Sequence, residues 1–305
     1  MRDKAYIEIV RLLLESAPAI FERPCFAMKG GTAINLFVEE MPRLSVDIDV
    51  VYTNHESTRD EAMAEIASGL ETARKQLASL GLEAEVESSQ GGGETKLFVR
   101  QGRHQVKIEV NHVFRGTVLP VETRRLGARA RDLFTTDLSV PMLNEAELYG
   151  SKLVAALDRQ HPRDLFDVLG LFARSGLSAG IVECFVCYLA GHNRPVHEVL
   201  FSNDLDTSIA FENEFTGMAQ IPITLEELKA VRFKLRETLI PALTSNHRRF
   251  LLSLVGGEPE WGLMICPHLS RLPAVQWKLK NLLKLKRNNA DKFARQTEEL
   301  QKRLG

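Results

Sequence analysis

The hydrophobic pattern of this 305-residue chain changes from strand-like to helix-like partway along its length. Up to about residue 125, short apolar or alternating runs predict strands, with helical patterns between them. Beyond about residue 142 the strand patterns end, and apolar residues recur at helical spacing between prolines. We therefore expect an α+β protein with an α/β core at residues 1–135 and an all-helical domain at residues 136–305.

The predicted elements are short in the first part and longer in the second. Strands are expected at 25–28, 46–52, 82–87, 96–100 and 105–110. Helices are expected at 32–38, 58–80, 144–157, 163–173, 225–239 and 247–254, with one long helix from about 274 to 304. Gly81 is expected to end the second helix, and the glycines at 91–93 to form a hairpin turn.

Composition excludes several classes of protein. Apolar residues make up 44% and charged residues 26%, which excludes wholesale disorder. No apolar run approaches the roughly 20 residues that span a bilayer, and the N-terminus has no signal-peptide pattern. Four scattered cysteines are too few for a disulfide framework, so the pair Cys184 and Cys187 is expected to be free thiols. We expect a cytoplasmic protein with no membrane association.

Charge is distributed unevenly along the chain. Residues 270–305 contain ten Lys or Arg and three acidic residues, a net charge of +7, whereas residues 1–269 carry −8. The cations Lys278, Lys280, Lys284, Lys286 and Arg287 fall among apolar residues that include Trp277. We expect the apolar residues to dock this helix on the helical domain. The cations then form either a solvated face or a track for the phosphates of a nucleic acid.

A glycine pair follows the first predicted strand. The chain has no P-loop, GxGxxG, HExxH or GxSxG motif, so the pair Gly30-Gly31 and the following Thr32 are the main phosphate-binding candidates. Paired glycines at the start of a helix let backbone N–H groups approach an anion, and Thr32 can add a hydroxyl. The alternative is a tight turn between a strand and a helix.

Two aspartates share one face of the next predicted strand. Alternation along 46–52 places Asp47 and Asp49 on one face and Val46, Ile48 and Val50 on the other. Neighbouring carboxylates repel each other unless a cation lies between them, and Mg²⁺ prefers such oxygen ligands. The alternative is a solvated edge strand.

A further strand carboxylate is a candidate third ligand. Glu109 lies on the face of the strand at 105–110 that opposes Val106 and Ile108. If this strand neighbours the one with Asp47 and Asp49, Glu109 completes a two-metal site. The alternative is a surface carboxylate.

Two predicted helices carry a fourth group. Lys152 is the only charged residue between Glu147 and Asp158, and Asp164 and Asp167 share a face of the next helix. The alternative role of these two aspartates is to complement the helix dipole.

The order of these segments resembles one family, the AbiEii-type toxin nucleotidyltransferases, which are related to the MenT toxins. That family has a Gly-Gly or Gly-Ser turn, then Ser-x-Asp-x-Asp, then a helical Lys followed by an Arg-Asp-aromatic segment. In this chain Gly30-Gly31, Ser45 to Asp49, and Lys152 with Arg163 to Phe166 match over about residues 25–175. Glu109 is a looser match to the strand acid of the family.

The resemblance implies a polymerase-β-type nucleotidyltransferase domain, with a mixed sheet and flanking helices, followed by a helical lobe. It implies Mg²⁺-dependent transfer of a nucleotide from an NTP to an RNA acceptor, in particular the 3′ end of tRNA, with release of pyrophosphate. It also implies a toxin of an abortive-infection toxin–antitoxin pair. The antitoxin would be a separate protein, and direct contact with it is not implied.

The resemblance also implies roles for the matching residues. Two Mg²⁺ ions, or Mn²⁺ in their place, would be held by Asp47, Asp49 and Glu109. Lys152 would neutralise the departing pyrophosphate, and Asp164 would either orient Lys152 or assist proton removal. The implied catalytic residues are thus Asp47, Asp49, Glu109, Lys152 and Asp164. The implied substrate-binding residues are Gly30, Gly31, Thr32, Ser45, Lys152 and Arg163, whereas Asp167 is expected to be structural.

Two other classes of function stay open at this point. One is a nucleotidyltransferase that modifies a small molecule or a protein, and the other is a non-catalytic module that binds a nucleotide or a partner. The basic C-terminal segment favours RNA over a small molecule. The complete set of Asp47, Asp49, Glu109 and Lys152 argues against a module that has lost catalysis.

Overall fold

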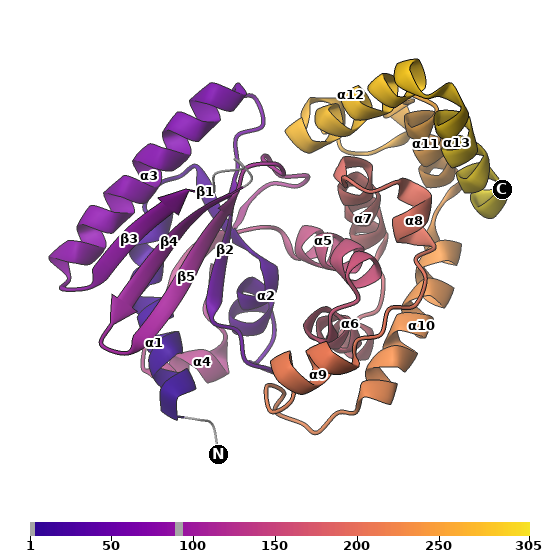
Figure 1. Ribbon diagram of the computed structural model, residues 1–305. Helices are drawn as coiled ribbons and strands as arrows, with labels where there is room; N and C mark the ends of the chain where they lie inside the picture. The colour runs from indigo at the N-terminus through magenta and orange to yellow at the C-terminus, as the bar shows by residue number, and fades with distance from the viewer. Residues whose placement is uncertain (1–3, 89–93) are drawn as a thin grey trace. The chain divides into compact units, whose positions relative to one another are not determined.

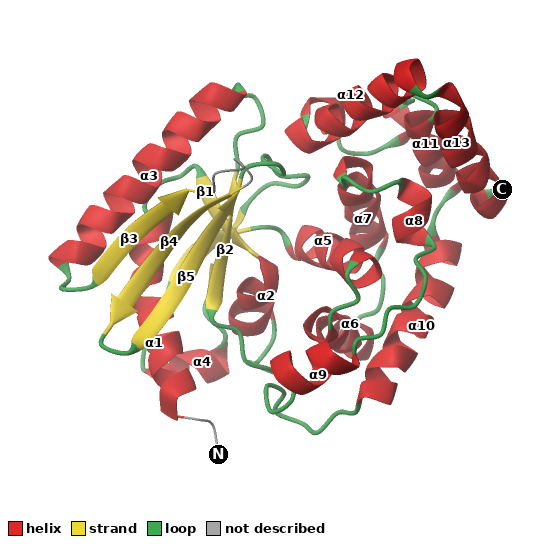
Figure 2. Cartoon of the chain, viewed as in Figure 1, coloured by secondary structure: helices red, strands yellow, loops and turns green. Residues whose placement is uncertain are grey.

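The computed structural model describes residues 4–88 and 94–305, which form two compact units that divide between Asn144 and Glu145. The strands that it describes all lie in the first unit, and the second unit is helical (Figure 2). The division falls later than the expected one after residue 135, because the strand Ser139–Met142 still belongs to the sheet. The predicted α+β fold is confirmed, and the predicted turn at 91–93 lies outside the described residues.

The first unit is built on one mixed sheet, whose strands run in the order β3-β4-β5-β2-β1-β7-β6. Strands β1 to β5 are labelled in Figure 1. The pairs β2–β5 and β1–β7 are parallel, and the other neighbours are antiparallel. The strands are β1 (Phe26–Lys29), β2 (Asp47–Tyr52), β3 (Glu83–Ser88), β4 (Glu94–Gln101), β5 (His104–Asn111), β6 (Glu122–Arg125) and β7 (Ser139–Met142). The helices are α1 (Lys4–Phe21), α2 (Gly30–Ala33), the π-helical η1 (Ile34–Val38), α3 (Arg59–Ser79) and α4 (Ala128–Phe134).

Helices α1 and α3 pack against each other and against one face of this sheet (Figure 1). On that face Phe26 of β1 is fully buried, and its ring lies so close to Gly69 of α3 that a Cβ at Gly69 would be 2.7 Å from it. Val50 of β2 and Val110 of β5 are in register and are also buried. Because strand side chains alternate, the polar residues of β2 and β5 lie on the opposite face.

Helix α3 has the ends that the sequence predicts. Thr58 caps its start, accepting from the N–H of Glu61 while the Glu61 carboxylate accepts from the N–H of Thr58. Gly81, just after the helix, has a φ of 79°, in the left-handed region that favours glycine.

The second unit consists of helices from Glu145 to Leu304. The longer ones are α5 (Glu145–Asp158), α6 (Pro162–Arg174), α7 (Ala179–Gly191), α10 (Leu225–Ala242), α11 (Ser245–Val255), α12 (Pro273–Asn288) and α13 (Ala290–Leu304). The shorter ones are α8 (Val196–Leu200), α9 (Ser208–Glu214), η2 (Trp261–Leu263) and η3 (Leu269–Arg271). Helices α5 and α7 cross closely at Gly150, where a Cβ would lie 2.6 Å from that of Cys184. Cys184 and Cys187 are buried free thiols, as predicted.

The long C-terminal helix predicted over 274–304 is in fact two helices. Asn289 separates α12 from α13, and its side-chain oxygen accepts from the N–H of Lys292 in the first turn of α13. Helix α12 packs on α7, α11 and α13 through Val275, Leu282 and neighbouring side chains. Among the helices that the structure describes, none is long and apolar enough to cross a membrane.

Candidate active site

The strand carboxylates come from two neighbouring parallel strands. Residues 47–50 of β2 pair with residues 107–110 of β5, so that Asp47 lies beside Lys107 and Asp49 beside Glu109. All four side chains project from the polar face of the sheet, because paired residues share a face. Side-chain exposure is 42% for Asp47 and 24% for Glu109, so the face is open to solvent. Strand β5 is thus the direct neighbour of β2, which is the arrangement that Glu109 needs to lie beside Asp47 and Asp49.

A lysine lies between these carboxylates. The Nζ of Lys107 is 3.1 Å from Glu109 Oε2 and 3.8 Å from Asp47 Oδ2. Burial disfavours its charged form, but Glu109 and Asp47 outweigh burial and raise the pKa of Lys107. The sequence analysis gave Lys107 no role, although strand alternation places it on the same face as Glu109.

Glu109 is also influenced by the next strand. Burial, followed by a hydrogen bond with Glu94 of β4, raises the pKa of Glu109, while Lys107 acts in the opposite direction. Lys96 of β4 is in register with Glu109. Its Nζ lies 2.7 Å from Glu94 Oε1. Four carboxylates and two lysines thus lie together on this face of β2, β5 and β4.

This face has some of the features of a metal site. Its carboxylate oxygens are the donors that Mg²⁺ prefers. Within residues 4–88 and 94–305, however, no group of three or more His, Cys, Asp or Glu side chains is arranged so that it could hold a metal. The carboxylate oxygens therefore fit Mg²⁺ as ligands. In this structure the ammonium of Lys107 lies between Asp47 and Glu109, where a shared metal ion would bind.

The glycine pair lies directly against the aspartate strand. Gly30 has a φ of 78°, and a Cβ there would lie 2.1 Å from Asp49 Oδ2. A Cβ at Gly31 would lie 2.6 Å from the Nη2 atom of Arg43. Gly30 is therefore required for its left-handed backbone conformation as well as for the approach of Asp49, whereas a side chain at position 31 would displace the end of the Arg43 side chain.

Thr32 and Ser45 hold the start of β2 in place. Thr32 is only 1% exposed, and its hydroxyl lies 2.9 Å from Ser45 Oγ and donates to the carbonyl of Asp47. The N–H of Ser45 donates to the hydroxyl of Tyr6 on α1. These contacts indicate that the Thr32 hydroxyl stabilises the start of β2, which they favour over the direct phosphate contact expected from its sequence position.

Arg43 is a buried cation beside the glycine turn that the sequence analysis missed. It is 3% exposed, and its Nη1 donates to the carbonyl of Leu44 at 2.8 Å. Its N–H donates to Asn35, whose amide in turn donates to the carbonyl of Gly31. An arginine in a loop gives no signal of burial in the sequence, so only the fold could place it here.

The second unit contains a buried ion-pair cluster on α5 and α6. Lys152 Nζ lies 2.8 Å from Asp164 Oδ1 and 3.1 Å from Asp167 Oδ2. The side chains are 8% exposed for Lys152 and 1% for each aspartate. The guanidinium of Arg159 forms two hydrogen bonds to Asp164, at 2.6 and 3.0 Å. Asp167, which the sequence places on the same helix face as Asp164, belongs to this cluster, and so does Arg159, to which the sequence gave no role.

The charge state of Asp164 bears on its role. Burial alone would raise its pKa, but Lys152 and Arg159 together hold the pKa of Asp164 well below its ordinary value. A carboxylate that binds protons so weakly is a poor general base. Of the two roles left open for Asp164, the geometry favours the orientation of Lys152.

Arg163 points away from this cluster. Its Nη2 lies 3.6 Å from Glu214 Oε2 on α9, and His161 Nε2 lies 3.1 Å from the same oxygen. Helix α6 begins at Pro162, with His161 as its N-cap. The segment 161–163 therefore directs Asp164 toward Lys152 and Arg163 toward α9.

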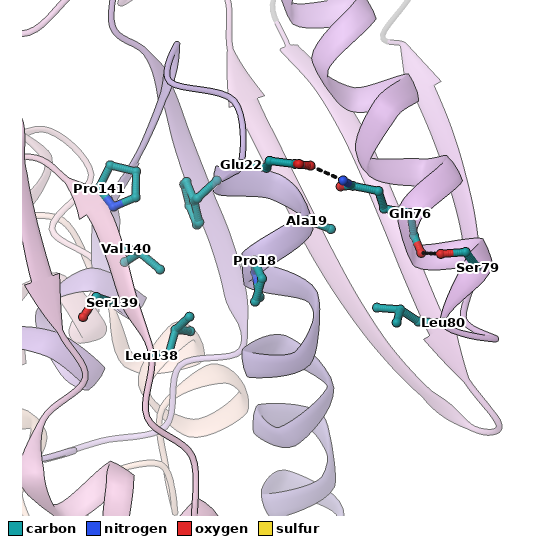
Figure 3. A pocket seen from close by; sticks show the side chains of 11 residues that line it. Pro18, Ala19, Glu22, Gln76, Ser79, Leu80, Leu138, Ser139, Val140 and Pro141 are labelled. Carbon is teal, nitrogen blue, oxygen red and sulfur yellow. Dashed lines mark hydrogen bonds between the residues drawn. The ribbon is translucent and has the colours of Figure 1, made fainter.

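An apolar hollow of about 530 Å³ in the first unit is distinct from these groups (Figure 3). It opens among α1, the end of α3 and β7, and Pro18, Leu80 and Val140 are among its lining residues. At its edge Gln76 donates to the carboxylate of Glu22 (Figure 3). None of the predicted site residues lines this hollow.

The chain matches a known protein family over most of its length. The family model described as "Nucleotidyl transferase AbiEii toxin, Type IV TA system" matches residues 11–281, so the class of protein is a nucleotidyltransferase. The chain belongs to the AbiEii toxin family, in a type IV toxin–antitoxin context, and the predicted resemblance is confirmed. Membership of this family implies a nucleotide substrate and an antitoxin partner.

A solved structure shows the same fold. It is "MenT4, nucleotidyltransferase toxin Rv2826c from Mycobacterium tuberculosis H37Rv", with a TM-score of 0.60 and 18% sequence identity. The similarity covers 92% of this chain and 95% of that chain. It confirms the predicted nucleotidyltransferase fold, a mixed sheet with flanking helices followed by a helical lobe. No curated protein matches the chain by sequence.

Proposed function

We propose that this protein transfers a nucleotide from an NTP to an RNA acceptor, the 3′ end of a tRNA, and acts as the toxin of its pair. The hydroxyl oxygen of the acceptor forms a bond to the α-phosphorus, and the bond from that phosphorus to the bridging oxygen of the β-phosphate breaks. Pyrophosphate leaves with the electron pair, and the hydroxyl proton is released to solvent.

One observation carries this proposal. The parallel pairing of β2 with β5 brings Asp49 beside Glu109 and places Asp47 on the same open face, in a chain of the AbiEii family. Two carboxylates on one strand and a third on its neighbour form a negative surface that favours a divalent cation. A purely structural sheet face has no need of that charge.

The proposed cofactor is a pair of Mg²⁺ ions, with Mn²⁺ as the alternative. Bound metal would activate the attacking hydroxyl and neutralise the triphosphate. Asp47, Asp49 and Glu109 would hold it, and Lys107 would then release the two carboxylates that it contacts.

The remaining site residues would bind the substrate. Lys152 would neutralise charge on the departing pyrophosphate, and Asp164 would hold Lys152 in position for this task. Backbone groups of Gly30 and Gly31 would contact phosphate oxygens, with Ser45 beside them. Arg163, which is 38% exposed, is the further candidate for a phosphate contact.

Two further features of the chain support the RNA acceptor and the cytoplasmic location. Net positive charge at residues 270–305 favours a polyanionic acceptor over a small neutral one. The free thiols of the described chain suit a reducing compartment, which supports a cytoplasmic location.

The test is to incubate the protein with each α-labelled NTP, Mg²⁺ and total cellular RNA, and to separate the products on a denaturing gel. Label in a tRNA-sized band is the expected result, and the Asp47→Asn variant should give none. Label in protein or in a small molecule would move the acceptor to the alternative class. Absence of label with every NTP, in a preparation that is folded, would contradict catalysis.

A further inference from the structure

One face of α12 carries cations and an aromatic ring but no acid. Helix α12 has no Asp or Glu in its 16 residues. Trp277, Lys280, Lys284 and Arg287 are all exposed and follow one another at spacings of three or four, so they lie on one side of the helix. We call these four residues the α12 face. They extend over roughly 15 Å at a rise of about 1.5 Å per residue.

The opposite side of α12 is occupied by packing. Val275 and Leu282 are buried there, and Lys278 is 5% exposed with its Nζ donating to the carbonyl of Arg194. Lys278 is therefore buried, whereas Lys280, Lys284, Lys286 and Arg287 of the same helix are exposed. Trp277, expected to dock the helix, is instead 54% exposed.

The cations of the α12 face lack acidic partners in the described part of the chain. No ion pair there involves Lys280, Lys284 or Arg287; the one interaction is that of Lys280 Nζ, 5.7 Å from the centre of the Trp277 ring. Some surface cations elsewhere in the unit are paired, such as Arg194 with Asp158 at 2.6 Å and Arg303 with Glu299 at 2.6 Å. On the α12 face, by contrast, three cations without acidic partners among the described residues lie together beside one aromatic ring.

A second candidate in the same unit contrasts with this face. A hollow of about 490 Å³ is lined by Arg194 and Arg303, but also by Asp158, Glu198 and Glu299. Its two arginines face three acids, so it has no positive charge left for an anionic ligand. The α12 face has charge and an exposed ring without such compensation.

We propose that the α12 face binds an unpaired segment of the RNA acceptor. Trp277 stacks on a base, and Lys280, Lys284 and Arg287 contact the phosphates that follow. Stacking on an aromatic side chain beside a positive track is the physical basis of single-stranded nucleic-acid binding. An acidic protein would use the cations but would not need a flat ring beside them. This inference rests on the proposed function only in taking the acceptor to be RNA.

Binding to fluorescein-labelled oligouridylate, followed by fluorescence anisotropy over a range of salt concentrations, tests the proposal. The triple variant Lys280→Ala/Lys284→Ala/Arg287→Ala should weaken binding and reduce the slope of log affinity against log salt by about 2. Trp277→Ala should weaken binding roughly 5- to 100-fold without changing that slope. Both variants should bind NTP as the wild type does.

A charge-matched control is available in the first unit. Arg11→Ala/Arg74→Ala/Lys75→Ala removes three cations that already have acidic partners on their own helices. This variant should keep the wild-type affinity and slope. A control that loses as much as the α12 triple variant would show that net charge alone is responsible, and would overturn the proposal.

Other outcomes also decide the matter. Unchanged affinity and slope in the α12 triple variant would overturn the proposal, as would a Trp277→Ala variant that binds like the wild type. Equal loss of polyglutamate binding in the triple variant, with no effect of Trp277→Ala on RNA, would identify an acidic protein as the partner instead. Nucleotide transfer is measured separately, so a wild type that binds RNA through α12 but transfers nothing would refute only the proposed function.

Discussion

Asp49 on β2 and Glu109 on β5 lie side by side, in register across a parallel strand pair. The two residues are 60 positions apart in the sequence, and they meet only because β5 returns to the centre of the sheet next to β2. Gly30 allows this pair to form, since the Asp49 carboxylate fills the space that a side chain at position 30 would need. The conformation of the glycine turn and the position of the acidic side chains therefore depend on each other.

The acidic face leads to the first prediction. Asp47→Asn should abolish nucleotide transfer, because it removes a carboxylate that is proposed to hold the metal. It should leave the fold intact, because Asp47 is 42% exposed and its ion pair with Lys107 is partly solvated. Transfer is measured on the denaturing gel and stability by thermal unfolding. Glu83→Gln, an exposed carboxylate on the edge strand β3, is the control and should transfer normally. Wild-type activity of Asp47→Asn would contradict the metal proposal.

The glycine turn leads to the second prediction. Gly30→Ala and Gly81→Ala place a side chain at nearly the same φ, 78° and 79°, but only at position 30 would the new Cβ meet another residue. Each should lose about 1–2 kcal/mol of unfolding free energy through backbone strain. Only Gly30→Ala should also lose transfer, because Asp49 must move. Chemical denaturation and the gel separate the two effects, and equal activity of both variants would contradict the account.

The alternation of apolar and polar residues was sufficient to predict β2, β5 and the face on which Asp47, Asp49 and Glu109 lie. It could not predict that Lys107 contacts both Asp47 and Glu109, because that depends on the pairing of distant strands. The strands β6 and β7 were missed for local reasons. The first consists of charged and polar residues at a sheet edge, and the second is four residues long and contains Pro141.

In the helical unit, periodicity predicted α5 and α6 but not the contacts between them. The sequence suggested Asp167 as structural, and in the structure it shares the Lys152 ammonium with Asp164, a contact that the sequence did not predict. A spacing of three residues on one helix gives the common face, yet the position of Lys152 depends on the turn at 159–161. The break at Asn289 was missed because apolar spacing continues across it, and helix capping by one asparagine is a weak sequence signal.

The buried cluster leads to the third prediction. Lys152→Met should lower turnover about 10²–10³-fold. It should also destabilise the protein by about 3–5 kcal/mol, because it removes the buried ammonium that Asp164 and Asp167 share, although Arg159 still pairs with Asp164. Adding Asp167→Asn removes one of these charges and should restore part of the stability but none of the turnover. Recovery of activity in the double variant would show that Lys152 is structural rather than a phosphate contact.

The last prediction concerns Lys278, on the packed side of α12. Burial lowers its pKa to about 8, although Glu198 acts in the opposite direction. Below pH 8 the lysine is protonated in both the folded and the unfolded chain, so its contribution to stability does not change with pH. Between about pH 8 and the unfolded value of 10.5 the unfolded chain binds more protons, and the contribution of Lys278 to stability rises with pH. The difference in unfolding free energy between the wild type and Lys278→Met should therefore shift in favour of the wild type as pH rises from 8 to 10.

Urea denaturation across this range measures this difference. Lys280→Met, on the exposed side of α12, is the control, and its unfolding free energy should change with pH in parallel with that of the wild type. Since Lys278 lies outside the α12 face, Lys278→Met should also bind oligouridylate with wild-type affinity. Parallel stability curves for Lys278→Met and the wild type would show that the Nζ of Lys278 is solvated rather than held against the carbonyl of Arg194.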